Sequence, residues 1–206
     1  MSNLGHSAAR AVASKAIDVV LKNVDKNREE GVCKLIDFMQ KYMSEEKLDV
    51  NYDKAREMVC NKDGAFNKYI NRVLDEVDPH VLKTMALNLG FEAFMYGTKT
   101  IRKNREKYDC NVPWLILMDP TSACNLHCTG CWAAEYGHKL NLTFDELDNI
   151  VTQGKELGVY FYMMTGGEPL VRKADIIRLC EKHNDCAFHC YTNGTLVDEK
   201  FCEDMK

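Results

Sequence analysis

Three cysteines crowd into one short stretch of the chain, "ACNLHCTGCWA" (123–133). Cys124, Cys128 and Cys131 lie within eight consecutive positions. The Cys-x3-Cys-x2-Cys spacing in a loop can present three thiolates to one face of a cubane iron–sulfur cluster, which four protein ligands normally hold. Such a site would leave one iron open to a ligand that is not part of the protein, so the stretch predicts a metal centre with a vacant coordination position.

Two further polar turns carry residues suited to ligand binding. The first, "TGGEP" (165–169), has paired glycines at 166 and 167, which let the backbone adopt positive φ and approach a ligand closely. Glu168 beside them can accept hydrogen bonds from an ammonium group. The second turn, "YTNG" (191–194), is a weaker signal, because Asn-Gly is common in ordinary turns.

All three features follow predicted strands. The apolar runs that predict strands are 112–118, 158–167 and 187–194. Helical patterns alternate with them, one opening at a Thr143–Glu146 capping box, one over 173–183 and one from Val197 or Asp198. The βαβαβα order predicts a parallel sheet with right-handed crossovers. Because chemistry in such folds gathers at the carboxyl ends of the strands, we expect the three turns to meet at one edge.

The first 110 residues have helical periodicity instead. Apolar stripes are predicted for Val12, Ala16, Val19 and Val20, and for Val32, Leu35, Ile36, Met39 and Met43. Asp78 and Pro79 are typical of an N-cap and first turn, and they open a helix toward residue 107 that Gly90 and Gly97 should weaken or break. We therefore predict a helical region at 1–110 and an α/β domain at 111–206.

The strand-end residues together resemble the radical S-adenosylmethionine (radical SAM) superfamily. The residues that carry the resemblance are Cys124, Cys128, Cys131, Gly166, Gly167, Glu168 and Pro169. The resemblance implies that the three cysteines bind a [4Fe-4S] cluster whose open iron is chelated by SAM. It also implies that the reduced cluster cleaves SAM to a 5′-deoxyadenosyl radical, that the Gly-Gly-Glu-Pro turn receives the methionyl amino group, and that Thr192 and Asn193 face cofactor or substrate. No catalytic residue is assigned.

The same resemblance defines the expected fold as an incomplete partial barrel of radical SAM type. Residues 112–206 supply the first three βα units of a (βα)6-type barrel, preceded by the all-α region. The chain ends in "FCEDMK", inside an expected helix, so we expect an N-terminal fragment that is inactive alone; a barrel split between two chains is the alternative. An electron donor such as flavodoxin or ferredoxin, an unknown small-molecule or peptide substrate and oxygen sensitivity also follow from the resemblance.

One position departs from the family pattern. The family usually has an aromatic residue just before the third cysteine, where it helps to hold the adenine, and this chain has Gly130. Trp132 follows the third cysteine and either replaces that aromatic contact or packs against the barrel. We favour packing.

Two other classes of protein compete with this interpretation. An electron carrier of ferredoxin type would use four local cysteines with a following Cys-Pro, which the chain lacks. A structural zinc module could use Cys124, Cys128, Cys131 and a histidine such as His127. Zinc modules usually have paired Cys-x2–4-Cys knuckles and would give the Gly-Gly-Glu-Pro turn no role.

Composition narrows the remaining options. The 206 residues are 46% hydrophobic and 28% charged, with a mean hydropathy of −0.36 and a net charge of −4. This balance indicates no nucleic-acid or membrane partner. The longest apolar run, 112–118, is too short to span a bilayer, and the N-terminus lacks the apolar region of a secretory signal. The N-terminus has no acidic residue before Asp18 and carries Ser and Arg, as an organellar transit peptide would, but its apolar spacing equally fits the ordinary helix that we favour. Crowded thiols without an export signal favour a reducing, cytoplasmic location.

The remaining cysteines look structural. Cys180, Cys186 and Cys190 fall on a helix, a loop and a strand, where a free cysteine packs as a small hydrophobe. Cys33 and Cys60 lie in the helical region, and we expect both to be buried.

Overall fold

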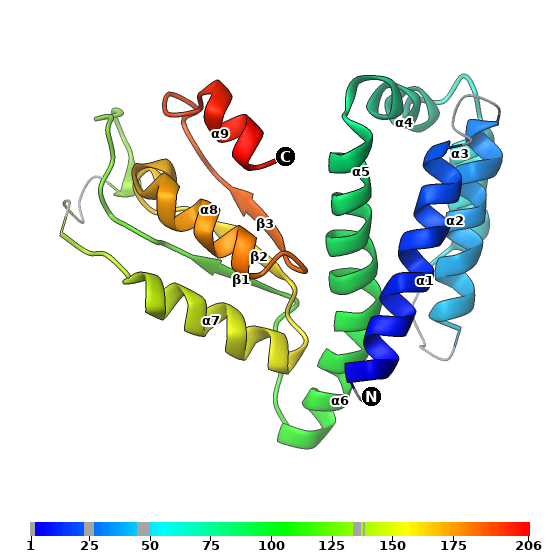
Figure 1. The fold of residues 1–206 in the computed structure, drawn as a ribbon, viewed down its shortest axis with the longest axis horizontal. Coiled ribbons are helices and arrows are strands. Elements are labelled where there is room, and N and C mark those ends of the chain that lie inside the picture. The colour runs from blue at the N-terminus through cyan, green and yellow to red at the C-terminus, as the bar shows by residue number, and fades with distance from the viewer. Residues whose placement is uncertain (1–2, 23–26, 45–49, 134–136, 138) are drawn as a thin grey trace. The chain divides into compact units, whose positions relative to one another are not determined.

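The chain divides into two compact units, Met1–Phe91 and Glu92–Lys206, and the division falls inside one helix. The computed structural model describes residues 3–22, 27–44, 50–133, 137 and 139–206. Figure 1 shows the order of the elements, and each unit is described here by itself. Among the described residues, no helix combines the length and the hydrophobicity that crossing a membrane requires.

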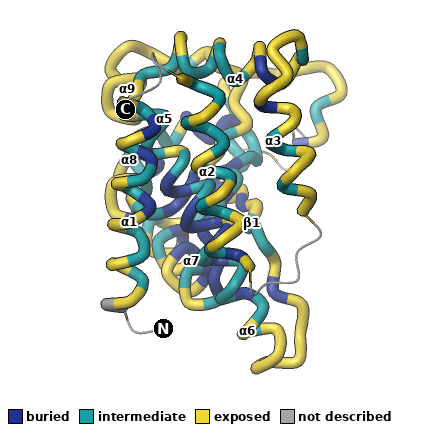
Figure 2. Tube along the Cα trace, turned by 90° about the vertical axis from the view of Figure 1, so that its right-hand side faces the viewer, coloured by how far each residue is buried: buried dark blue, intermediate teal, exposed yellow. Residues whose placement is uncertain are grey.

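The first unit is helical, as the periodicity predicts. Its elements are α1 (Asn3–Lys22), α2 (Arg28–Tyr42), α3 (Tyr52–Cys60), α4 (Ala65–Glu76), α5 (Pro79–Met85) and the start of the π-helix η1 (Ala86–Gly97). The side chain of Asp78 accepts a hydrogen bond from the His80 N–H at 2.8 Å, so the predicted cap of α5 is confirmed. Helix α2 contains no fully buried residue (Figure 2).

The buried face of α1 differs from the predicted one. Val20 is buried as predicted, but Val12 and Val19 are each 57% exposed, and Ala13 and Ile17 are buried instead. The two stripes are adjacent on the helix and equally apolar, so helical periodicity alone does not choose between them. The prediction for Val12 and Val19 was wrong because packing against the neighbouring helices selected the other stripe.

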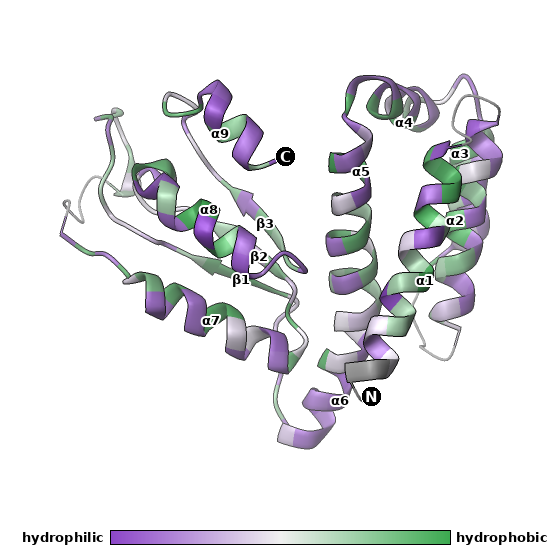
Figure 3. Cartoon of the chain, viewed as in Figure 1, coloured by the Kyte–Doolittle hydropathy of each residue, from purple (hydrophilic) through white to green (hydrophobic). Residues whose placement is uncertain are grey.

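The predicted long helix is continuous but irregular. Helix α5 leads into η1, which contains Gly90 and Gly97, and α6 (Thr98–Tyr108) follows directly. The glycines therefore do not break the helix, and this part of it is wound as a π-helix. A Cβ on Gly97 would lie 2.5 Å from the carbonyl oxygen of Gly158, so close backbone contact requires glycine there. Helix α6 is hydrophilic along nearly all its length (Figure 3).

In the described part of the second unit the strands pair in parallel in the order β1-β2-β3, which confirms the predicted parallel sheet. Its strands are β1 (Leu115–Met118), β2 (Phe161–Met164) and β3 (Ala187–Cys190), all shorter than the predicted runs. Helix α7 (Phe144–Leu157) joins β1 to β2, and the 3₁₀-helix η3 (Pro169–Arg172) with α8 (Lys173–Lys182) joins β2 to β3. Helix α9 (Glu199–Asp204) follows β3, and the Thr143–Glu146 capping box is present.

One face of the sheet packs against α7 and α8, which also contact each other (Figure 1). Tyr162 is fully buried on this face, and its hydroxyl lies 3.0 Å from the Val151 carbonyl oxygen of α7. In register beside it are Ile116 and Phe188, and the Phe188 ring stacks on that of Tyr162. The helix-covered face therefore supplies the core that fixes where the three strands end.

Candidate functional site

The turn after β2 lies directly against the segment that enters the cysteine loop. The N–H of Thr165 donates to the Met118 carbonyl at 3.0 Å, that of Gly167 to Thr121 at 2.9 Å and that of Glu168 to Ala123 at 2.8 Å. These bonds continue the parallel pairing beyond the strands. They place two of the three predicted turns side by side at the carboxyl edge of the sheet.

This close approach explains the paired glycines. Gly166 has φ of +104°, a conformation that other L-residues rarely adopt. A Cβ on Gly167 would lie 2.1 Å from the carbonyl oxygen of Ala123, which is backbone and has little freedom to move. The two glycines are therefore required by the contact with the cysteine loop as well as by any ligand.

The cysteine loop is closed at its base by a short antiparallel pairing. The N–H of Ser122 donates to the Leu140 carbonyl at 2.8 Å, and the N–H of Leu142 donates to the Pro120 carbonyl at 3.1 Å. The Thr121 hydroxyl adds a bond of 2.6 Å to the side-chain oxygen of Asn141. The loop that carries the three cysteines thus begins and ends at one fixed point.

Cys124, Cys128 and Cys131 all line one small cavity of about 50 Å³, together with Gly167. Cys128 is exposed, the other two are half-buried, and none of the three forms a disulfide. The Leu126 N–H points at the sulfur of Cys124, at 3.4 Å. Among the described residues, no three His, Cys, Asp or Glu side chains are grouped so that they could hold one metal ion.

The thiols of Cys124, Cys128 and Cys131 are the groups that would bind the implied iron–sulfur cluster. Three thiols on one cavity match the ligand type that iron–sulfur clusters require, and an N–H directed at a ligand sulfur is one of the features that set cluster potential. A cubane takes each thiolate on a separate iron. The residues present therefore fit a cluster held by three cysteines.

Glu168 connects the second turn to the third. It is 1% exposed, and its carboxylate accepts hydrogen bonds from the Thr192 hydroxyl at 2.7 Å, the Asn193 N–H at 2.8 Å and the Leu170 N–H at 3.0 Å. The carboxylate is thus directed at the Thr192–Asn193 turn and the start of η3. Backbone at Gly166 and Gly167 lines the cavities instead.

A residue that sequence reasoning missed, Asn125, ties the cysteine loop to the third turn. Its side-chain oxygen accepts a hydrogen bond from the Asn193 amide at 2.9 Å, and its amide donates to the Thr195 hydroxyl at 2.7 Å. The predicted convergence of the three turns is therefore present, and each turn is bonded to both of the others. Adjacency to Cys124 was the one sequence signal for Asn125.

A larger cavity of about 560 Å³ adjoins the cysteine cavity, since Ser122 and Ala133 line both. Asp119, Trp132 and Gly166 also line it. Its volume lies within the range of about 300–1,000 Å³ that is typical of ligand pockets. Trp132 is 59% exposed, so the favoured expectation that it packs against the barrel was wrong.

The cysteines outside the loop differ in burial. Burial raises the pKa of Cys180 to about 12 and that of Cys190 to about 11, and it raises the pKa of the buried Cys186 thiol as well. These thiols stay protonated at neutral pH, which agrees with a structural role. In the helical unit Cys60 is exposed and Cys33 half-buried, so the expectation of burial was wrong for this pair.

A three-stranded parallel sheet with a cysteine loop and a glycine-rich turn at its carboxyl edge defines an α/β domain, and the carboxyl edge is where such folds generally bind ligands. Residues 118–206 match the family model of the radical SAM superfamily. This segment is therefore a radical SAM domain, as its motifs predicted.

Curated relatives agree with this assignment. The chain is 30% identical over 100 residues to the AdoMet-dependent heme synthase of Methanosarcina barkeri, covering 47% of this chain and 28% of that protein. It is 46% identical over 92 residues to the GTP 3′,8-cyclase of Alkaliphilus oremlandii, covering 42% of this chain and 29% of that protein. It is 30% identical over 106 residues to the GTP 3′,8-cyclase of Clostridium perfringens, covering 48% of this chain and 32% of that protein. The chain thus spans about a third of the length of these relatives, and no solved structure matches it.

Proposed function

We propose that the protein is a radical SAM enzyme in which Cys124, Cys128 and Cys131 hold a [4Fe-4S] cluster and leave one iron for SAM. The observation that carries the proposal is the meeting of all three cysteines and Gly167 at one cavity. When bound and reduced, the cluster supplies the electron that cleaves SAM to a 5′-deoxyadenosyl radical, which acts on a substrate still to be identified.

The chain's own residues bind and orient the cofactors in this proposal. The thiols of the loop bind iron as thiolates. Carbonyl groups of the turn at Gly166 and Gly167 accept hydrogen bonds from the methionyl ammonium, because the Glu168 carboxylate is already bonded to Leu170, Thr192 and Asn193. Glu168 and Pro169 then fix the shape of the turn. Thr192 and Asn193 hold Glu168 and border the cofactor.

We further propose that Trp132 supplies the aromatic contact to adenine that Gly130 does not provide. Its exposed ring lines the larger cavity, next to Gly166 and Asp119. The two adjoining cavities suit a ligand with an amino-acid end near the cysteines and a nucleoside end near Trp132. A purine face stacked on an indole ring is a favourable arrangement.

The rest of the proposal concerns the whole protein. Residues 111–206 would form the first half of a (βα)6-type barrel, and residues 1–110 a helical region before it. A flavodoxin or ferredoxin would supply electrons. A cytoplasmic, reducing location would follow from the crowded thiols without an export signal, and oxygen sensitivity would follow from an exposed low-potential cluster.

The competing functions are an iron–sulfur electron carrier and a structural zinc module. Zinc without iron and sulfide in the purified protein would favour the zinc module. Iron and sulfide with no affinity for SAM would favour the electron carrier.

The decisive experiment replaces one thiol. The full-length protein is reconstituted anaerobically with iron and sulfide, reduced and given SAM, and 5′-deoxyadenosine is measured. The parent should form it and Cys128→Ala should not, while Cys110→Ala, at an exposed cysteine outside the loop, should behave as the parent. A four-iron cluster and parental SAM cleavage in Cys128→Ala would refute the ligand assignment.

A further inference from the structure

We propose that Arg172 is a positioning residue that fixes the cysteine loop against the Gly-Gly-Glu-Pro turn. The proposal rests on the function proposed above and adds a residue to which neither the motifs nor the comparisons give a role. Arg172 ends η3, four positions after Glu168, and its side chain is 15% exposed.

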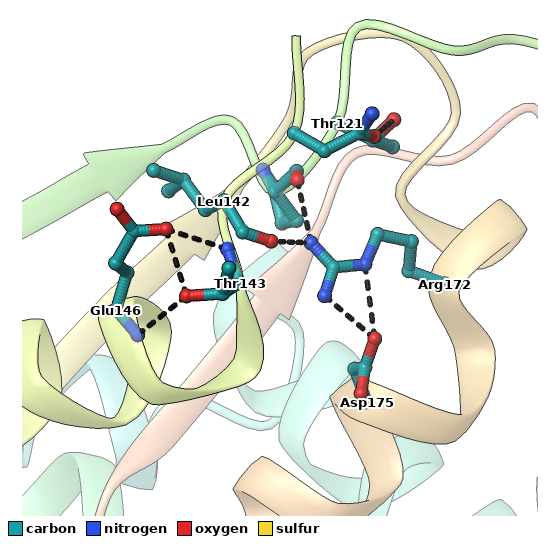
Figure 4. A network of polar contacts seen from close by, with 8 residues as sticks. Thr121, Leu142, Thr143, Glu146, Arg172 and Asp175 are labelled. Carbon is teal, nitrogen blue, oxygen red and sulfur yellow. Dashed lines mark hydrogen bonds and ion pairs between the residues drawn. The ribbon is translucent and has the colours of Figure 1, made fainter. Parts of the chain in front are cut away.

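The guanidinium of Arg172 bonds to both ends of the cysteine loop (Figure 4). Its Nη1 donates to the carbonyl oxygen of Pro120 at 2.9 Å and to that of Leu142. Pro120 lies four residues before Cys124, and Leu142 lies just before the Thr143 cap of α7. One cationic group thus joins the entry and the exit of the loop.

Asp175 sets the orientation of this guanidinium. Its Oδ2 accepts from Nη2 of Arg172 at 2.6 Å and from Nε at 2.9 Å. With these two donors committed to Asp175, Nη1 is directed at the two carbonyls (Figure 4). Lysine has no planar set of donors and cannot reproduce this arrangement.

The other end of η3 is equally constrained. Glu168 accepts from the Leu170 N–H at 3.0 Å, so the helix begins at the anion that orders the third turn. The four residues of η3 therefore form a short, hydrogen-bonded link between Glu168 and Arg172. Through this link the position of the loop that carries the cysteines depends on the position of the turn proposed to bind SAM.

The hydrogen bonds of Arg172 stabilise the base of the cysteine loop and not the apolar core. The two carbonyls belong to the base of the loop, whereas the apolar core of this unit lies between the sheet, α7 and α8. Loss of the hydrogen bonds from Arg172 to the Pro120 and Leu142 carbonyls should loosen the base of the loop, while the core should stay packed. The expected result is a correctly folded domain that holds its cofactors less well.

The test compares Arg172→Lys with Arg178→Lys. Arg178 lies in the same unit, and its guanidinium lies 3.7 Å from the centre of the Phe144 ring, so this variant controls for a general effect of exchanging arginine for lysine. Hydrogen exchange of the Ser122 and Leu142 amides in the protein without cofactors should accelerate about tenfold in Arg172→Lys, because hydrogen bonds to a charged group are lost. The thermal unfolding midpoint should stay close to that of the parent.

With the cluster reconstituted, Arg172→Lys should raise the KM for SAM about tenfold with a smaller change in kcat, and it should release iron to a chelator faster than Arg178→Lys. Asp175→Asn should likewise raise the KM for SAM and speed the release of iron to the chelator. Parental amide exchange and parental KM in Arg172→Lys would overturn the proposal, and so would losses that only follow a lowered unfolding midpoint. Because the amide exchange is measured without cofactors, a parent that binds no cluster would refute the proposed function while leaving this test intact.

Discussion

The carboxylate of Glu168 accepts a hydrogen bond of 2.7 Å from the hydroxyl of Thr192, which lies 24 residues later in the chain. This bond joins the turn after β2 to the turn after β3. Since the Asn193 N–H donates to the same carboxylate at 2.8 Å, a buried anion holds the third turn in place.

Replacing Thr192 with Val should therefore lower the free energy of unfolding of the second unit. A hydrogen bond to a charged group contributes about 1.5–3 kcal/mol, and the variant leaves one carboxylate oxygen with a donor fewer. Urea denaturation followed by circular dichroism measures the change. Thr152→Val, at an exposed position of α7, is the matched control and should change stability by less than about 0.5 kcal/mol. Equal stabilities of the two variants would contradict the importance of the bond.

Gly167→Ala should disrupt the contact between the turn and the cysteine loop. The added Cβ would meet the Ala123 carbonyl oxygen at 2.1 Å, so the backbone must move. We expect the loop to bind less iron after reconstitution, measured as iron per chain. Gly90→Ala is the control, because a Cβ there meets nothing within 4 Å and removing a helical glycine should stabilise the first unit by about 0.5–1 kcal/mol. An iron content equal to that of the parent in Gly167→Ala would show that the loop adapts without loss.

The convergence of the three turns could be predicted because polar residues follow successive strands and parallel strands end at one edge. The side-chain contacts that join these turns could not be predicted. Arg172 meets Pro120 across 52 residues, and Asn193 meets Asn125 across 68. Neither Arg172 nor Asn125 differs in residue type from an ordinary polar surface residue. Side-chain partners of this kind depend on where the backbone of another turn passes, which local sequence does not encode.

The errors in the helical unit have a similar origin. Val12 and Ile17 are both apolar and lie on adjacent stripes of α1, yet one is exposed and the other buried. Periodicity defines the direction of an apolar face to within about one residue, and the neighbouring helices decide the rest. Likewise, the π-helical winding of η1 around Gly90 has no composition signal, because glycine weakens any helix in the same way.

The thiol of Cys33 should react slowly with alkylating agents at neutral pH. Burial is the main cause that raises its pKa to about 11, and the neighbouring Cys60 sulfur, 3.8 Å away, adds to it. At pH 8 the thiolate fraction is then about 0.1%, against about 25% for a thiol of ordinary pKa near 8.5, so alkylation should be slower on the order of a hundredfold. The stability that the protonated thiol contributes is present below pH 9 and declines as the pH rises toward 11.

Mass spectrometry of Cys33 after timed treatment with iodoacetamide, from pH 7 to pH 11, measures this rate, with N-acetylcysteine as the reference thiol. Cys60→Ser should increase the rate at pH 8, because one cause of the raised pKa is removed. A rate that levels off near pH 9 would contradict the assignment of a raised pKa.

Trp132→Ala should weaken the binding of SAM without preventing cluster formation. The indole ring lines the larger cavity beside Gly166, and stacking of a base on an aromatic ring contributes about 1–3 kcal/mol, so the Kd for SAM should rise about tenfold or more. Trp132→Phe, which keeps an aromatic face, should lie between the parent and Trp132→Ala. Equilibrium dialysis of the reconstituted protein measures the three affinities.

Two comparisons make this prediction specific to the adenine. Affinity for S-adenosylhomocysteine should fall together with that for SAM, whereas affinity for methionine, which has no purine, should not change. Trp114→Phe is the matched control, since the Trp114 indole donates to the Ala93 carbonyl at 3.1 Å and packs between Phe94 and Phe161, away from both cavities. That variant should alter stability and leave the Kd for SAM as in the parent. If Trp132→Ala bound SAM as tightly as the parent, the larger cavity would have to take the substrate instead, and the adenine contact would have to come from another part of the protein.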